Sequence, residues 1–382
     1  MAQFINWGSG KEGNLNISAA NLGGIGGFGV GTFTGTAGNN YGTFSDAAYF
    51  NGGTGGRVGD LCIIHQSQGT GAGNWEIVKI SKRSGTTVYF DRNLTNTYVS
   101  GAQIQSAPNL NGGTISGNLG PYTAWNGSTG GIIFIVDKGT LTVSGSIVAT
   151  GSGFRGASQS GSDGSNSVGG KQGESYLGTW NTVTTAANYS SGGGGGKTGY
   201  DNGGGGGGGG HSSSGSTGGA GQASGGTGGA SCGSANLTTM FFGGSGGGGS
   251  RGRNNNYNGG YGGAGGGIIV IFAKVLSVSG YITCNGGNGE NTDAYYNPGA
   301  GGAGAGGSIL IKCKSASLGT SGVSASAGSA GYSPDSNSGG AGSAGRIHCD
   351  YYSSVTGTTY PDLDSKQDST LTVPSGGFFA FM

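Results

Sequence analysis

The chain has 382 residues, of which 98 are glycine, only 32% are hydrophobic and only 9% are charged. Its 17 Lys and Arg residues balance its 16 Asp and Glu residues, so the net charge of +1 gives no broad field to attract nucleic acid or an anionic membrane. No segment approaches the roughly 18 apolar residues of a membrane span, and the first residues lack the pattern of a secretory signal. We therefore expect no nucleic-acid partner, no membrane insertion and folding in the cytoplasm.

Residues 1–126 hold much of the charge and predict an N-terminal antiparallel β domain for attachment or assembly. Short runs rich in Val, Ile, Thr and aromatic residues at 58–65, 74–80 and 86–90 are bounded by Gly, Asn and Ser clusters. This pattern is typical of consecutive strands in a meander or small β-roll, and residues 99–104 could add a fourth strand.

A repeated unit follows within residues 127–350. Each copy has a strong apolar strand, a tight turn, a weaker alternating strand and then glycine; the strong strands begin after Gly131, Gly267 and Gly307, and a truncated fourth copy begins at Gly345. Repeats that cannot bury their own apolar faces must stack. We therefore expect residues 132–136, 268–272 and 309–311 to be adjacent strands in one stack. The fold class is all-β, with stacked β repeats.

The first two copies are 136 residues apart, whereas the next two are 40 residues apart, so residues 152–266 form an insertion. Gly192 to Gly196 and Gly203 to Gly210 are unbroken glycine runs. An ordered solution is a bundle of polyglycine II helices, with three residues per turn and outward-facing backbone groups that neighbouring helices satisfy. The alternative is a flexible Gly/Ser linker.

Residues 351–382 are a C-terminal tail whose apolar end, 377–382, is expected to dock on its own chain or on a neighbouring subunit. The five cysteines have no CxxC spacing, and three of them, Cys284, Cys313 and Cys349, fall in apolar runs. This indicates buried free thiols rather than a disulfide framework or a metal site.

Aromatic residues in the glycine-rich half are the main functional signal. Aromatic faces beside Asn and Arg suit sugar rings and exposed protein loops; the alternative is that they cap open edges of the glycine lattice. The candidate receptor-binding residues are Tyr176, Trp180, Tyr189, Phe241, Phe242, Arg251, Arg253, Tyr257, Tyr261, Tyr295 and Tyr296, and Tyr332 lies in a later loop.

Catalytic and cofactor signals are weak in this sequence. The 16 carboxylates are scattered, and the three histidines form no Ser-His-Asp or metal-binding pattern. The glycine runs do not end in the Gly-Lys-Ser/Thr of a phosphate-binding loop. We therefore expect no enzyme activity, no metal and no cofactor.

Two sets of residues carry a resemblance. The segments GGIIFI at 130–135, LTVSGSIVATGSGFRG at 141–156 and GGAGGGIIVI at 262–271, with GDLCIIHQ at 59–66 and GNWEI at 73–77, resemble glycine-rich virion proteins of tailed bacteriophages over about residues 58–350. The glycine runs are also similar to the distal tail-fibre adhesins of T-even-like phages, whose tips are sandwiches of polyglycine II helices with variable loops.

The resemblance implies a virion protein made in the host cytoplasm and released by lysis, with other virion proteins as partners and a homo-oligomeric assembly. One function is that of a tail-fibre or tail-tip adhesin that binds a bacterial surface glycan or outer-membrane protein. The alternative is a structural capsid-fibre, decoration or filament-forming protein that self-assembles through glycine-rich faces; an extracellular surface structure is the alternative location.

Overall fold

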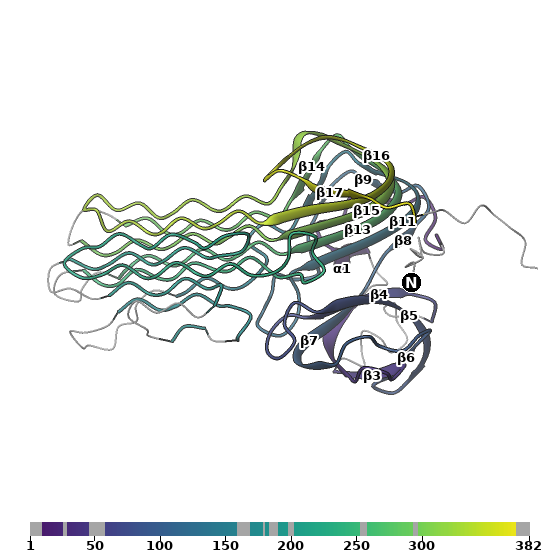
Figure 1. The fold of residues 1–382 in the computed structure, drawn as a ribbon, viewed down its shortest axis with the longest axis horizontal. Helices are drawn as coiled ribbons and strands as arrows, with labels where there is room; N and C mark the ends of the chain where they lie inside the picture. The colour runs from purple at the N-terminus through teal and green to yellow at the C-terminus, as the bar shows by residue number, and fades with distance from the viewer. Residues whose placement is uncertain are drawn as a thin grey trace, which may run out of the picture.

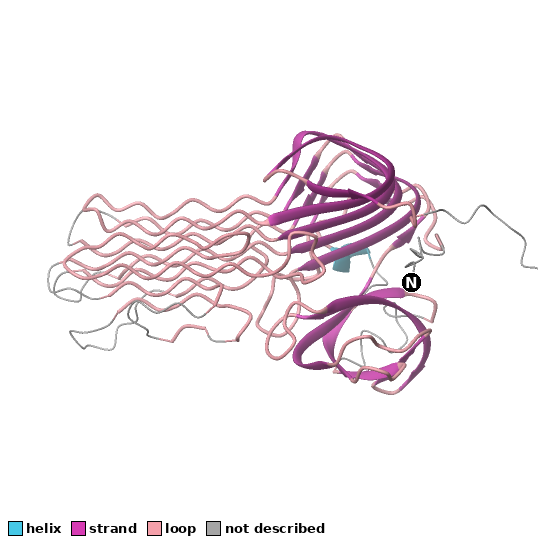
Figure 2. Ribbon diagram, in the orientation of Figure 1, coloured by secondary structure: helices cyan, strands magenta, loops and turns pink. Residues whose placement is uncertain are grey.

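The computed structural model describes residues 10–25, 29–45, 58–158, 169–178, 180–182, 190–197, 202–252, 258–292 and 297–371. These residues form an all-β fold with one short helix among them, α1 (Leu22–Ile25). It has three parts: a closed antiparallel barrel, a curled parallel sheet, and a bundle of long extended segments that projects from one end of the sheet (Figures 1 and 2). The apolar end of the tail, 377–382, lies outside the described residues.

The barrel has the strand order β2-β3-β6-β5-β4-β7. Its strands are β2 (Val30–Gly35), β3 (Tyr41–Phe44), β4 (Leu61–Gln66), β5 (Trp75–Ser84), β6 (Thr87–Phe90) and β7 (Tyr98–Ser106). The four strands expected from the sequence are present and antiparallel. The expected meander or roll is instead closed by β2 and β3, two glycine-containing strands whose Phe33 and Phe44 fill the barrel interior.

The parallel sheet contains the repeats. Its strands are β1 (Asn16–Ile17), β8 (Asn109–Leu110), β9 (Thr114–Ile115), β10 (Asn118–Leu119), β11 (Ile132–Val143), β12 (Ser146–Val148), β13 (Ile268–Val278), β14 (Tyr281–Thr283), β15 (Ser308–Ser324), β16 (Arg346–Tyr360) and β17 (Asp364–Gln367). The four strong strands β11, β13, β15 and β16 are neighbours, and Ile133, Ile269, Ile309 and Ile347 are in register across them. The stacked-repeat prediction is therefore confirmed.

Each sheet face buries a different apolar layer, because successive side chains of a strand point to opposite faces. Ile133, Ile269 and Ile309 point into the curl of the sheet, together with the buried thiols of Cys284, Cys313 and Cys349. Phe134, Val270 and Leu310 belong to a second cluster that also includes Leu61 and Ile63 of the barrel. Strand β4 is therefore buried along its whole length, because one of its faces lines the barrel and the other packs on the sheet.

The extended segments are polyglycine II helices. The N–H groups of Gly203, Gly206 and Gly209 donate to the carbonyls of residues 297, 300 and 303, at 2.9–3.0 Å. The N–H groups of residues 204, 207 and 210 instead donate to residues 197, 194 and 191, and those of residues 205 and 208 donate to residues 219 and 216. Every third residue thus faces the same neighbour, as a helix of three residues per turn requires.

The segment 203–210 lies at the centre of a lattice. Its carbonyls accept N–H groups from three further segments, which contain residues 244–250, 226–229 and 340–343. Together with the three segments that accept its N–H groups, six neighbours surround it. Backbone groups that would be orphaned in a chain without side chains are thereby satisfied. The described glycine runs of the insertion, 192–196 and 203–210, are therefore ordered architecture, as expected, rather than a linker.

The repeats also explain how the bundle is joined to the sheet. After β14 the chain runs outward along residues 284–292 and returns along 297–307 into β15; after β15 it runs outward along 325–332 and returns along 337–345 into β16. Each repeat therefore extends as a pair of glycine helices, and the insertion adds further helices beside them (Figure 1).

Candidate functional site

The structure describes six of the eleven sequence candidates. Tyr189, Arg253, Tyr257, Tyr295 and Tyr296 lie outside the described residues. The other six are described, and they separate by burial into an interior set, a set at the joint between barrel and bundle, and one tyrosine on the surface.

Phe241, Phe242 and Arg251 form the interior set. Phe242 is fully buried between Trp125 and Phe154, with ring centroids 5.4 and 5.3 Å away, where the glycine helices leave the sheet. Phe241 and Arg251 are also buried, at the two ends of the segment 241–251. Their burial removes all three from the candidate contact surface. They instead pack the inside and base of the bundle, where glycine provides no apolar volume.

Tyr176 and Trp180 are half-buried at the joint between barrel and bundle. The Tyr176 ring lies 5.0 Å from that of Phe241. The Arg155 guanidinium stacks 3.8 Å above the Trp180 ring, and Arg155 also pairs with the buried carboxylate of Glu174 at 2.9 Å. These contacts favour the interpretation that the two aromatic residues cap the lattice.

Tyr261 differs from the other described candidates because 47% of it is exposed. Its backbone N–H donates to the Glu290 carboxylate at 2.8 Å, and its carbonyl accepts the Glu290 N–H at 2.9 Å. Glu290 belongs to the glycine helix 284–292. On the other side of that helix, the Tyr332 carbonyl accepts the Thr292 N–H at 2.9 Å, and Tyr332 is 63% exposed. Two exposed tyrosines therefore flank one glycine helix.

Asparagines line this helix between the tyrosines. The side-chain oxygens of Asn285, Asn288 and Asn291 accept the N–H groups of Ser326, Ser329 and Tyr332, each at 2.8 Å. Because residues three apart lie on one side of a polyglycine II helix, the asparagines form a ladder along one edge. Sequence reasoning missed this ladder and Glu290, although the three-residue spacing of the asparagines was a signal for it.

We define the tyrosine face as Tyr261, Asn288, Glu290, Asn291 and Tyr332. Tyr261 lies seven residues before β13, and Tyr332 lies eight residues after β15. At about 3.1 Å per residue, both lie roughly 20 Å beyond the sheet, at the far end of the bundle. The face combines apolar rings with exposed amide and carboxylate groups, and it can therefore make both stacking and hydrogen-bonding contacts.

Two of the described histidines, His65 and His211, are buried in hydrogen-bonded positions that do not resemble a catalytic site. Burial lowers the pKa of His65 to about 4, and its ring bonds the Ser67 hydroxyl and the Met240 carbonyl. Burial and the nearby Arg346 charge lower the pKa of His211 to about 3. His211 contacts the Ser308 hydroxyl at 3.2 Å, but that hydroxyl donates to the Phe241 carbonyl, and the second ring nitrogen of His211 has no partner among the described residues.

Comparison with known proteins gives no match to a family model, to a curated protein or to a solved structure. Within the described parts of the chain, no helix is long and apolar enough to cross a membrane. The same described residues contain no group of three His, Cys, Asp or Glu side chains arranged to hold a metal ion.

Proposed function

We propose that this protein is a non-enzymatic attachment protein of a phage particle, which uses the far end of its glycine bundle to contact a receptor on a bacterial surface. The observation that carries the proposal is the tyrosine face, held about 20 Å beyond the sheet by a lattice of backbone hydrogen bonds. The resemblance of the repeats and glycine runs to phage virion proteins supports the same function.

The bundle is suited to presenting a binding surface. Six neighbours fix the central helix, so side chains and chain reversals at its far end start from a rigid support. A rigid support lowers the entropy lost when those groups bind a partner. Because glycine occupies the interior, residues at the far end can vary without affecting a conventional apolar core.

The chemistry of the tyrosine face favours a glycan or an exposed protein loop as receptor. Tyrosine buries a large apolar area with few rotatable bonds, which is why it is frequent at binding surfaces. Glu290, Asn288 and Asn291 add exposed polar groups on the helix that lies between the two tyrosine-bearing segments.

Binding of the fluorescently labelled full chain to a panel of bacterial strains tests this function. We expect the double variant Tyr261→Ala/Tyr332→Ala to lose at least tenfold in affinity for a strain that the wild type binds. The matched control is Tyr281→Ala/Tyr360→Ala, because both tyrosines are 61% exposed but lie on the sheet. We expect this control to bind like the wild type.

Two outcomes would overturn the proposal. One is equal loss of binding in both double variants, which would place the contact elsewhere. The other is concentration-dependent formation of ordered polymers with no binding to any strain, which would favour the structural, self-assembling alternative.

A further inference from the structure

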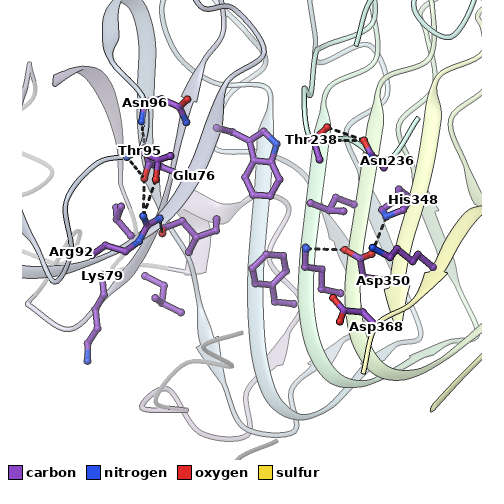
Figure 3. A pocket seen from close by; sticks show the side chains of 18 of the residues that line it. Glu76, Lys79, Arg92, Thr95, Asn96, Asn236, Thr238, His348, Asp350 and Asp368 are labelled. Atoms are coloured by element: carbon purple, nitrogen blue, oxygen red, sulfur yellow. Dashed lines mark hydrogen bonds and ion pairs between the residues drawn. The ribbon is translucent and has the colours of Figure 1, made fainter. Parts of the chain in front are cut away.

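A cleft separates the barrel from the edge of the parallel sheet, and none of the tyrosine-face residues lines it. Its volume is about 640 Å³, within the usual range for small-molecule sites. Strand β5 and the 91–96 segment form one wall, β15, β16 and the 366–368 segment form the other, and the loop with Asn236 and Thr238 borders it (Figure 3).

The sheet wall of the cleft lies where the sheet face that packs on the barrel changes from apolar to charged side chains, toward the edge strands β15, β16 and β17. The residues in register across β11, β13, β15, β16 and β17 are Val136, Phe272, Lys312, Asp350 and Lys366. Val136 and Phe272 pack in the cluster shared with the barrel, whereas Lys312, Asp350 and Lys366 line the cleft. The sequence of the edge strands therefore keeps the barrel from closing over this half of the sheet.

Charges on the sheet wall are held in fixed pairs. Lys312 Nζ lies 2.8 Å from the Asp350 carboxylate, which also contacts His348 at 3.1 Å. His348 contacts Asp364 through its other ring nitrogen at 2.7 Å. Burial penalises the charged forms, but hydrogen bonds and opposite charges outweigh it: they raise the pKa of His348 and lower that of Asp350 to about 2.

The barrel wall has a similar pair. The nearly buried Glu76 carboxylate lies 3.1 Å from Arg92 Nη1 and also accepts the N–H groups of Thr95 and Asn96 at 3.1 Å. The sheet wall therefore presents a donor and an acceptor side by side in a fixed orientation, whereas the barrel wall presents the exposed Arg92 guanidinium, because the Glu76 carboxylate is buried and already bonded (Figure 3).

An indole lies between the two walls. Trp75 is half-buried, and its ring nitrogen donates to the Leu237 carbonyl at 2.8 Å, which fixes the ring orientation. The indole nitrogen is thus already occupied, so a ligand in the cleft meets the apolar part of the ring. Phe272, Leu310, Leu61, Ile77 and Val78 also contribute apolar atoms to the lining.

The cleft is electrically balanced. Its lining contains four Lys or Arg residues and four Asp or Glu residues: Lys79, Arg92, Lys312 and Lys366, and Glu76, Asp91, Asp350 and Asp368. This balance gives no net attraction for a phosphate or for a polyamine. Adjacent donor and acceptor groups instead match a vicinal diol, in which one hydroxyl accepts from Lys or Arg and its neighbour donates to a carboxylate.

We propose that this cleft binds an uncharged oligosaccharide, with one sugar ring against Trp75 and its hydroxyl groups bonded to the Lys312–Asp350 pair of the sheet wall and to Arg92 of the barrel wall. The site is separate from the tyrosine face and does not depend on it. The cleft binds the sugar without making or breaking any bond in it.

The test uses the purified full chain with cellotriose, maltotriose, mannotriose and chitotriose as probes, and with spermine and inositol hexakisphosphate as charged comparisons. Saturation-transfer NMR and titration of tryptophan fluorescence measure binding. We expect at least one trisaccharide to bind, Trp75→Leu to weaken it at least tenfold, and the exposed-site variant Lys366→Met to weaken it severalfold. Trp180→Leu, a tryptophan outside the cleft, should leave affinity unchanged.

The readouts separate this proposal from the attachment function. Absence of transfer to all four trisaccharides at millimolar concentration would overturn it, and so would binding of only spermine or inositol hexakisphosphate. Equal effects of Trp75→Leu and Trp180→Leu would also overturn it. If Trp75→Leu does not fold, Lys366→Met decides alone, because that side chain is exposed. The tyrosine-face variants should keep full trisaccharide affinity.

Discussion

Gly206 shows how little space the lattice leaves around each residue. A Cβ placed on it would fall well inside contact distance of the Gly247 carbonyl oxygen, and the clashing atoms are backbone that cannot rotate away. The same carbonyls accept the hydrogen bonds that hold the bundle together, so relieving the clash breaks those bonds. Glycine is therefore required here for close approach of backbones.

We expect Gly206→Ala to lower the free energy of unfolding by about 3 kcal/mol, the upper end of the cost of overpacking. Gly287→Ala is the matched control, because its Cβ would lie 3.1 Å from the nearest atom, at the edge of the bundle. Urea denaturation followed by circular dichroism measures both. Equal stability of the two variants would contradict the close-packed lattice.

Asn288 illustrates the problem at the edge of the lattice, where a helix lacks a neighbour on one side. Its side-chain oxygen accepts the Ser329 N–H, which a further glycine helix would otherwise accept. Asn288→Ala should cost about 1 kcal/mol, the net value of one hydrogen bond. Asn93→Ala on the barrel surface is the control and should be neutral. Hydrogen exchange at the Ser329 amide should rise only in the first variant.

At the scale of elements, the strong apolar strands carry the fold. Ile269 lies between Ile133 and Ile309 in the middle of the sheet and is fully buried. Ile269→Asp should lower the free energy of unfolding by about 4 kcal/mol or more, because it buries an unpaired carboxylate. Lys274→Asp, further along the same strand and half-buried, should cost far less. An unchanged melting temperature in Ile269→Asp would refute the stacked layer.

These elements also show what could be predicted from the sequence. The repeat strands were predictable because each copy has to bury the same apolar pattern, and the glycine helices because packed polyglycine II helices satisfy the backbone groups of an unbroken glycine run. Barrel closure was not predictable, because β2 and β3 are short and rich in glycine. Which helices neighbour one another was also not predictable, since identical glycine segments carry no pairing information.

The candidate site was harder to predict than the fold. Phe241 and Phe242 resemble exposed recognition residues in sequence, because they stand among glycines with no apolar periodicity. Their burial depends on packing between the barrel and the base of the bundle, which is a tertiary property. Tyr261 was predicted as a receptor-binding residue and is exposed, as that role requires, but its partner Glu290 comes from a segment that only the lattice brings beside it.

At the scale of the whole molecule, two buried histidines lie where its parts meet. His65 of barrel strand β4 bonds the Met240 carbonyl at the base of the bundle, at 2.8 Å. His211, at the end of the central glycine helix, contacts Ser308 at the start of β15, at 3.2 Å. Both are neutral in the folded protein, because burial lowers their pKa to about 4 and about 3.

These histidines make the assembly of the three parts sensitive to acid. Below their ordinary pKa of about 6.5 the unfolded chain binds protons that the folded chain excludes, so stability falls as the pH falls from about 6.5 toward 4 for His65 and toward 3 for His211. The slope is about 1.4 kcal/mol per pH unit for each histidine. His348 acts in the opposite direction: because its pKa is raised, its contribution is complete below about 6.5 and is lost as the pH rises through the folded value.

We therefore expect the free energy of unfolding to fall between pH 6.5 and pH 5. In His65→Gln, and likewise in His211→Gln, the slope of this fall should be smaller by about 1.4 kcal/mol per pH unit. His348→Gln should leave the fall below pH 6.5 nearly unchanged and should instead remove a loss of stability as the pH rises above about 6.5, because it removes the one described histidine that gains protons on folding. Urea denaturation at pH 5, 6 and 7 measures all four proteins. If His65→Gln and His211→Gln keep the wild-type pH slope, these histidines are not excluded from protonation and do not hold the barrel, bundle and sheet together as neutral hydrogen-bonding groups.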